Sequence, residues 1–173
     1  MIREIVIYPD KRLKQKSQPV TEFNEELHAL LDDMYETMAV KNGVGLAAIQ
    51  IAVPKQVLII NIPIEEQDNA QPKENTLEII NPVFLEKVGK QKNQEGCLSV
   101  PGFYEDVERA KYVKLQYQDR DGNEHIIEDD DFLAIAIQHE CEHLEGHLFI
   151  EKLSILKRKK FEKEWKKKLA KKK

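Results

Sequence analysis

Two histidines stand four residues apart in the sequence His139-Glu140-Cys141-Glu142-His143. On a helix, residues four apart lie on one face, so both imidazoles can bind a single metal ion. Glu140 is offset from His139 by about 100°, where a carboxylate can take a proton from water at the ion without being a ligand. Cys141 falls on the opposite side and is expected to be a small buried residue. This spacing predicts a metal-dependent hydrolase in which the histidines bind the ion and Glu140 transfers protons.

A catalytic ion of this kind has three protein ligands and keeps one position open for water, so a third ligand is needed. His147 lies four residues after His143, too close for the third histidine of the metzincin pattern. Glu162 lies nineteen residues after His143, a spacing that some H-E-x-x-H peptidases use, but it stands in a lysine-rich run. Cys97 stands in a turn-like segment, residues 95–99. From the residues alone Cys97 is the strongest candidate, and Glu162 remains an alternative.

Two segments have the spacing of amphipathic helices. In the first, leucines and methionines recur at helical intervals between Asn24, a suitable N-cap, and Asn42-Gly43, a suitable stop. The histidine motif lies in the second, from Phe132 to Glu145, which is apolar in its first half and ends near Gly146. We expect both helices to pack on the core.

The segments between these helices are rich in Val, Ile and Leu and predict β-strands. The predicted strands run from Gln56 to Ile62, from Leu77 to Phe84, from Tyr112 to Tyr117 and, after an Asp-Gly turn, from His125 to Ile127. Strands clustered between helices without regular alternation indicate an α+β domain. We expect mostly antiparallel sheets packed around a central metal-binding helix, with a C-terminal helix.

Length and composition limit the class of protein. At 173 residues the chain is long enough for one compact domain, and its two cysteines are too few for a disulfide framework. No apolar run approaches the roughly 18 residues needed to cross a bilayer, and the first residues lack the apolar segment of a signal peptide. We therefore expect a cytoplasmic protein that makes no membrane contact.

Charge divides the chain into an acidic body and a basic tail. The net charge is -4, yet residues 151–173 contain twelve Lys and Arg residues against three Asp and Glu residues. We expect a catalytic domain at residues 1–150 and a basic C-terminal helix or tail at residues 151–173. The tail is either a solvated cationic helix end or a surface for RNA phosphates. Its apolar residues recur every three to five positions and would form an irregular apolar edge: Leu153, Leu156, Phe161, Trp165 and Leu169.

Three motifs together resemble those of peptide deformylases, which remove the formyl group from the N-terminal methionine of new bacterial proteins. The motifs are Gly43 to Gln50 (G-x-G-x-A-A-x-Q), Glu95 to Ser99 (E-G-C-x-S) and Gln138 to His143 (Q-H-E-x-x-H). The resemblance extends from the first residues to about Phe149. It implies N-formyl-methionyl nascent peptides as substrates and, for the basic tail, a contact with the ribosome near the exit of the nascent chain.

The resemblance also implies a metal site and a base. Cys97, His139 and His143 would bind one divalent ion, with Glu140 as general base and then general acid. The family implies Fe(II) as the native ion. Zn, Ni or Co would be replacements, because one thiolate and two imidazoles suit each of these metals.

Further roles follow from the same motifs. Gln50 and the backbone N–H of Leu98 would bind the oxyanion that develops during the reaction. Glu95 resembles the family's structural acid, which pairs with an arginine twelve residues after the ligand cysteine. In this chain that arginine is Arg109.

Selectivity for methionine requires an apolar slot near the ion. Ile135 shares the His139 side of the predicted helix, and we take it and Val44 as candidates for the slot, with plain core packing as the alternative. Gly45 and Gly96 complete the predicted substrate-binding residues, because glycine permits close approach of a peptide backbone. A simple turn position is the alternative for Gly45.

Two other functions remain open from the residues alone. An H-E-x-x-H zinc peptidase would use Glu162 as its third ligand. A non-catalytic RNA-binding module would hold a structural metal with no open position. Deformylation is the function that we expect.

Overall fold

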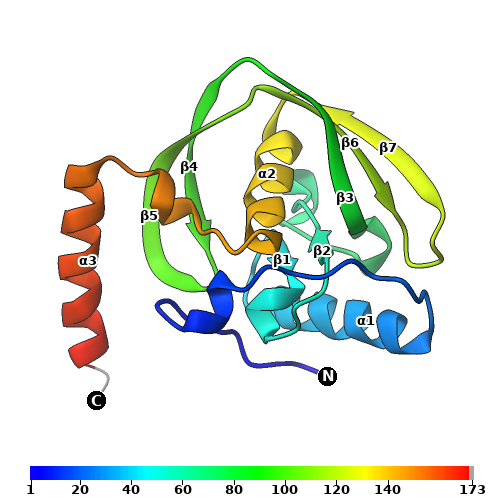
Figure 1. Cartoon of the computed structure of the whole chain (residues 1–173), viewed down its shortest axis with the longest axis horizontal. Helices are drawn as coiled ribbons and strands as arrows, with labels where there is room; N and C mark the ends of the chain where they lie inside the picture. Colours follow the sequence, from blue (N-terminus) through cyan, green and yellow to red (C-terminus); the bar gives the residue numbers. More distant parts are fainter. Residues whose placement is uncertain (172–173) are drawn as a thin grey trace.

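Helix α2 (Phe132–Leu144) lies at the centre of the structure, between a five-stranded sheet and a long β-hairpin (Figure 1). The structure is a computed structural model that describes residues 1–171, so the last two residues of the predicted basic tail lie outside the described residues. The other helices are α1 (Glu25–Val40), α3 (Ile155–Ala170) and the short 3-10 helices η1 (Lys11–Lys14), η2 (Ala48–Ile51), η3 (Glu65–Gln67), η4 (Lys73–Asn75) and η5 (Phe149–Lys152). The strands are β1 (Gly45–Ala47), β2 (Val57–Ile60), β3 (Leu77–Val88), β4 (Gln91–Cys97), β5 (Val100–Arg109), β6 (Tyr112–Gln118) and β7 (Glu124–Asp129).

The strands pair in antiparallel fashion throughout both sheets. The larger sheet has the order β1-β2-β3-β6-β7, and β4 pairs with β5 in the separate hairpin. Val113, Leu115 and Tyr117 alternate along β6 and are buried in one cluster with Ala134 and Ile137 of α2. The expected α+β fold, with antiparallel sheets around a central helix and a C-terminal helix, is confirmed.

Four predicted strands correspond to β2, β3, β6 and β7. Strands β1, β4 and β5 have no counterpart among the predictions. Strand β4 reads Gln-Lys-Asn-Gln-Glu-Gly-Cys, which lacks the apolar alternation on which a strand prediction depends. The segment 95–99, predicted as turn-like, contains the end of β4 and the turn at Leu98 that leads into β5. Cys97 is therefore the last residue of a strand.

Helix α1 begins at its predicted cap, where Asn24 Oδ1 accepts a hydrogen bond from Leu27 N at 3.1 Å. Its leucine and methionine face is buried in a second cluster with β2. Ten residues of α2 are buried, among them the polar residues Gln138, His139, Glu140 and His143. A helix packed this completely gives its side chains few alternative positions.

Helix α3 begins after Ser154, whose Oγ accepts from Lys157 N at 3.3 Å. Phe161 and Trp165 are buried in a third cluster with Val100 of the hairpin. Leu156 was expected on the apolar edge, but it is 82% exposed, because the edge runs through Phe161 and Trp165 and leaves Leu156 on the solvent side. None of the helices in residues 1–171 is long and apolar enough to span a membrane.

Candidate metal centre and active site

Cys97, His139 and His143 come together beside α2. One potential ligand atom from each lies within 4.8 Å of the other two, and Cys97 Sγ is 3.4 Å from His143 Nε2. A thiolate and an imidazole that share a tetrahedral ion are about 3.6 Å apart, from bond lengths of about 2.3 and 2.1 Å. The two imidazole rings come from one face of the helix, with centroids 5.1 Å apart. The three donors therefore fit a single divalent ion.

His139 is oriented by a buried carboxylate. Its Nδ1 donates to Glu95 Oε1 at 2.8 Å, which leaves Nε2 facing the other two donors. Burial alone would raise the pKa of Glu95, but hydrogen bonds from Arg109 and His139 lower it below its ordinary value. Glu95 is therefore an ionised acceptor that fixes the tautomer of the histidine.

Arg109 completes this arrangement. Its Nε and Nη2 each donate to Glu95 at 2.8 Å, and its Nη1 lies 2.6 Å from Glu142 Oε1. Only 2% of the Arg109 side chain and 5% of the Glu95 side chain are exposed. The pairing of Glu95 with Arg109, which the resemblance implied, is present and is joined by Glu142 from α2.

Arg109→Met should destabilise the protein strongly, because it leaves Glu95 with an uncompensated buried charge. Breaking one side of a buried ion pair costs about 3–5 kcal/mol. Urea titration of the metal-free protein measures the free energy of unfolding. Lys90→Met is the matched control, since Lys90 pairs with Glu108 on the surface at 3.6 Å, where an ion pair contributes about 0–1 kcal/mol. Equal losses for the two variants would contradict a structural role for Arg109.

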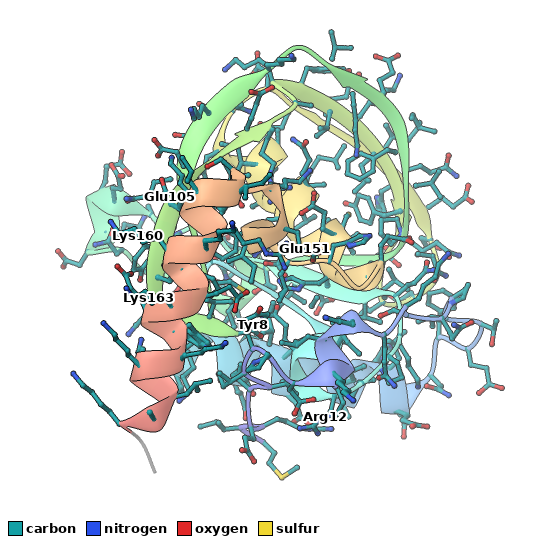
Figure 2. All side chains as sticks on the ribbon, turned by 60° about the vertical axis from the view of Figure 1, so that its left-hand side comes forward. Tyr8, Arg12, Glu105, Glu151, Lys160 and Lys163 are labelled. Carbon is teal, nitrogen blue, oxygen red and sulfur yellow. The ribbon has the colours of Figure 1, made fainter. Side chains whose placement is uncertain are left out.

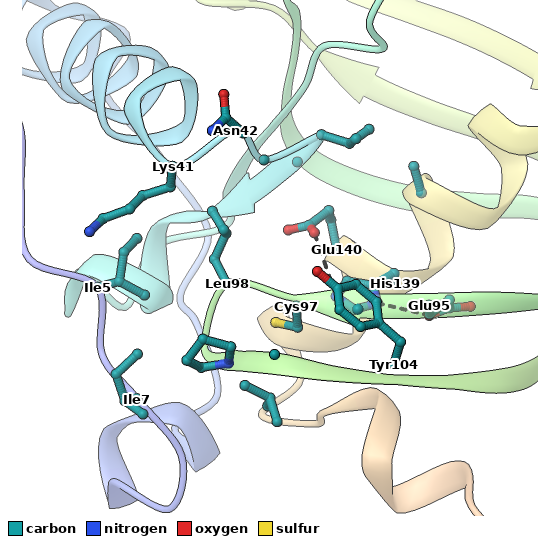
Figure 3. A pocket seen from close by; sticks show the side chains of 18 of the residues that line it. Ile5, Ile7, Lys41, Asn42, Glu95, Cys97, Leu98, Tyr104, His139 and Glu140 are labelled. Carbon is teal, nitrogen blue, oxygen red and sulfur yellow. Dashed lines mark hydrogen bonds and ion pairs between the residues drawn. The ribbon is translucent and has the colours of Figure 1, made fainter. Parts of the chain in front are cut away.

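Glu140 lies beside the three donors and is buried (Figure 3). Its Oε1 is 3.7 Å from His139 Nε2, while its Oε2 has no hydrogen-bond partner among residues 1–171. Burial raises the pKa of Glu140 to about 7, against an opposing effect of His139. A carboxyl group with a pKa near neutrality both accepts and releases protons readily, as general acid–base catalysis requires.

The Gln50 amide is held in one orientation. Its Oε1 accepts from Ala47 N at 2.9 Å, so its Nε2 donates to Ser99 Oγ at 3.0 Å and points toward Cys97 Sγ at 3.4 Å. Because a backbone N–H can only donate, the assignment of Oε1 and Nε2 is fixed by Ala47. One N–H of the amide therefore faces Cys97.

A cavity of about 910 Å³ opens beside these residues. Figure 3 shows Cys97, His139 and Glu140 along its inner wall, with Leu98 reaching across toward Asn42. Gln50 and His143 are buried and are not among the lining residues. The remaining residues predicted for the site all line the cavity: Val44, Gly45, Gly96, Cys97, Leu98, Ile135, His139 and Glu140.

Two glycines allow other side chains of the site to pack closely against the backbone. A Cβ on Gly45 would lie 3.0 Å from Glu140 Cγ. A Cβ on Gly96 would clash with the Tyr104 ring, which stands at the cavity mouth and is 62% exposed. The spacing of the sequence motifs did not indicate the bond from Gln50 to Ser99. Only the position of Ser99 within the Glu95 to Ser99 motif could have drawn attention to it.

The other third-ligand candidates lie elsewhere. Glu162 is on α3 and accepts a hydrogen bond from Tyr8 Oη at 2.5 Å. His147 is exposed and pairs with Glu151 at 3.2 Å. Cys141 is buried on the other side of α2, as expected, where burial raises the pKa of its thiol. The geometry thus favours Cys97.

Comparisons with known proteins agree on one family. The model of the family described as polypeptide deformylase matches residues 2–159. A peptide deformylase of Nautilia profundicola is 57% identical over 166 residues, covering 96% of this chain and 94% of the relative. A peptide deformylase of Wolinella succinogenes is 60% identical over 163 residues, covering 94% of this chain and 95% of the relative. The crystal structure of a peptide deformylase from Legionella pneumophila matches with a TM-score of 0.88 at 39% identity, over 100% of this chain and 99% of that one. The chain therefore belongs to the polypeptide deformylase family.

Proposed function

We propose that Cys97, His139 and His143 bind the divalent ion with which this enzyme removes the N-formyl group of nascent peptides. The observation that carries this proposal is the meeting of these three donors within 4.8 Å, beside a buried carboxylate. A bound divalent ion supplies Lewis-acid polarisation of the formyl carbonyl and lowers the pKa of a water molecule to about 7. The zinc-peptidase and RNA-module alternatives receive no support from the family match.

Glu140 is the proton carrier in this proposal. Its carboxylate takes a proton from the water that attacks the formyl carbon and delivers a proton to the leaving α-amine nitrogen as the C–N bond breaks. Formate and a free N-terminus result. Such a proton shuttle contributes about 10²- to 10⁴-fold in rate.

Gln50 and the backbone N–H of Leu98 are the proposed oxyanion donors. Negative charge develops on the former formyl oxygen, and a donor fixed in advance there is worth about 3 kcal/mol. The bonds from Ala47 and to Ser99 hold the Gln50 amide before the substrate arrives. The N–H that points toward Cys97 Sγ is the one that we propose as the donor to the oxyanion.

The remaining predicted residues form the proposed substrate cavity. Val44 and Ile135 supply apolar surface close to the three donors, where a methionine side chain fits. Gly45 and Gly96 line the same cavity and are the proposed points of contact with the peptide backbone. The absence of a Cβ at these positions also lets Glu140 and Tyr104 pack closely against them. The whole proposed site lies within residues 1–150, which we propose as the catalytic domain.

Release of formate from formyl-Met-Ala-Ser tests the proposed function directly. Protein reconstituted with Fe(II) or Ni(II) should release one formate for each free N-terminus formed, and acetyl-Met-Ala-Ser should react far more slowly. Absence of formate with both metals would show that the proposal is wrong.

We further propose Fe(II) as the native ion, with Zn, Ni or Co as replacements. The donor set alone suits all four metals, so the family resemblance decides between them. Metal analysis of protein purified without oxygen, compared with protein purified in air, tests this choice. Iron is expected in the first sample and should be lost or exchanged in the second.

The partner proposed for α3 is the ribosome, which would place the enzyme in the cytoplasm with its substrates. Most lysines of α3 are exposed, among them Lys160 and Lys163 (Figure 2). A dense row of cations attracts RNA phosphates regardless of sequence. Residues 151–173 would then be a basic extension of the catalytic domain.

Charge-reversal substitutions test whether ribosome binding depends on the surface of α3 itself or only on the net charge of the protein. Lys159→Glu, Lys160→Glu and Lys163→Glu together should weaken co-sedimentation with ribosomes and reduce the salt dependence of log K by about 0.7–0.9 for each phosphate that is no longer neutralised. The control changes the exposed Lys87, Lys90 and Lys92, around the turn between β3 and β4, to Glu, with the same change in net charge. Equal weakening by both sets would contradict a specific role for α3.

A further inference from the structure

The backbone of residues 5–8 connects the two elements that hold the Gln50 amide. Val6 N donates to Gln50 O at 2.7 Å, and Tyr8 N donates to Ser99 O at 2.9 Å. Ser99 is also the residue whose Oγ accepts from the Gln50 side chain. Residues 5–8 belong to neither a helix nor a strand, so their position depends on these bonds and on side-chain packing.

Helix α3 holds the other side of Tyr8 (Figure 2). Trp165 Nε1 donates to Tyr8 O at 3.0 Å, and Tyr8 Oη donates to Glu162 Oε1 at 2.5 Å. The Tyr8 ring also packs on Phe161 and Trp165, with centroids 5.7 and 6.3 Å away. Both aromatic residues of α3 are buried. Tyr8 is therefore bonded through its N–H to the active-site hairpin and through its carbonyl and hydroxyl groups to α3.

A second link joins α3 to the same hairpin. Lys168 Nζ donates to Pro101 O at 2.5 Å and lies 5.1 Å from the centroid of the Trp165 ring. Pro101 lines the cavity and follows Ser99 by two residues. The C-terminal helix thus contacts the active-site region along two routes.

We infer that Tyr8 and Trp165 are positioning residues for deformylation. Through their contacts, α3 holds residues 5–8 in place beside Gln50 and Ser99. The inference rests on the proposed role of Gln50 as an oxyanion donor. A donor acts only where the charge develops, and a displacement of about 1 Å can lower a rate by about 10²-fold. Helix α1 holds the N-terminal segment at Arg3, and α3 holds it at Tyr8, next to the bonds with Gln50 and Ser99.

The test removes two hydrogen bonds and keeps an aromatic ring at each position. Tyr8→Phe with Trp165→Phe loses the bond to Glu162 and the bond to the Tyr8 carbonyl. In the full-length, metal-loaded enzyme, kcat for formyl-Met-Ala-Ser should fall by about tenfold. This loss is smaller than the roughly 10²-fold loss expected for a displacement of about 1 Å. KM should change by less than about twofold, because the oxyanion exists only in the transition state. Metal content should be unchanged.

Leu156→Ala is the matched control on the same helix. Leu156 is 82% exposed, so this variant should have the kcat and KM of the unmodified enzyme. A purely stabilising role for α3 would lower the midpoint of thermal unfolding of the double variant without changing kcat at 25 °C, and that result would overturn the inference.

Gln50→Ala separates the inference from the proposed function. Alone it should lower kcat by about 10²-fold. In that background the Tyr8 and Trp165 substitutions should have no additional effect, because they act through the missing amide. If Gln50→Ala leaves kcat unchanged, the proposed role of Gln50 is wrong and the inference falls with it. If Gln50→Ala lowers kcat but the double substitution does not, or lowers it equally in both backgrounds, the inference alone is overturned.

Discussion

Glu140→Gln is expected to lower kcat for formate release from formyl-Met-Ala-Ser by about 10²- to 10⁴-fold, the usual contribution of a positioned general base. Glutamine has nearly the same volume as glutamate and therefore keeps the close packing against Gly45, but it cannot accept the proton of the attacking water. Initial rates with metal-saturated protein provide the measurement. The bound metal, measured on the same samples, should stay the same, because Glu140 is outside the three-donor group.

The fold should tolerate this substitution. Glu140 is buried, and burial raises its pKa to about 7, which shows that its charged form is disfavoured there. A neutral amide removes that cost. Glu145→Gln is the control, since Glu145 is exposed at the end of α2 and should leave kcat unchanged. A Glu140→Gln enzyme with the kcat of the unmodified protein would require a different proton acceptor.

Cys97→Ala should abolish stable metal binding and, with it, formate release. Two imidazoles remain, but the thiolate that completes the group is lost. Even the loss of a residue that only orients a ligand weakens metal binding by about 10- to 100-fold, so the loss of a ligand should cost more. Metal content after dialysis, together with formate release measured in parallel, tests this expectation.

Two control substitutions make the metal measurement specific. Cys141→Ala removes the other thiol, which is buried away from the donors and whose raised pKa keeps it protonated, so the metal should be retained. Glu162→Ala should also retain it, because that carboxylate is bonded to Tyr8. A stoichiometric ion in Cys97→Ala, or its loss in Glu162→Ala, would favour the peptidase arrangement.

The arrangement of His139, Glu140 and His143 could be predicted because it is local. Helix geometry alone places residues four apart on one face and the intervening carboxylate at its edge. The apolar patterns of β2, β3 and β6 were predictable for a similar reason, since burial on one or both faces leaves a periodic trace in the sequence.

The hairpin that carries Cys97 could not be predicted in this way. Strand β4 is polar and is held by backbone pairing with β5, which leaves no apolar periodicity to detect. The motif resemblance nevertheless assigned Cys97 as a ligand, and the structure places it next to His143 although 46 residues separate them. Leu156 is the reverse case: its spacing in the sequence predicted a position on the apolar edge of α3, but in the structure it is exposed.

By itself, then, the sequence predicted the donors and the base and indicated the family to which their motifs belong. Only the tertiary structure decided how the distant segments support them. The bond from His139 to Glu95, the orientation of the Gln50 amide between Ala47 and Ser99, and the contacts of α3 with Tyr8 all join residues by packing and hydrogen bonding. Trp165 and Tyr8 are 157 residues apart, and no periodicity or motif records such a contact, because its energy depends on where the whole chain brings the two groups together.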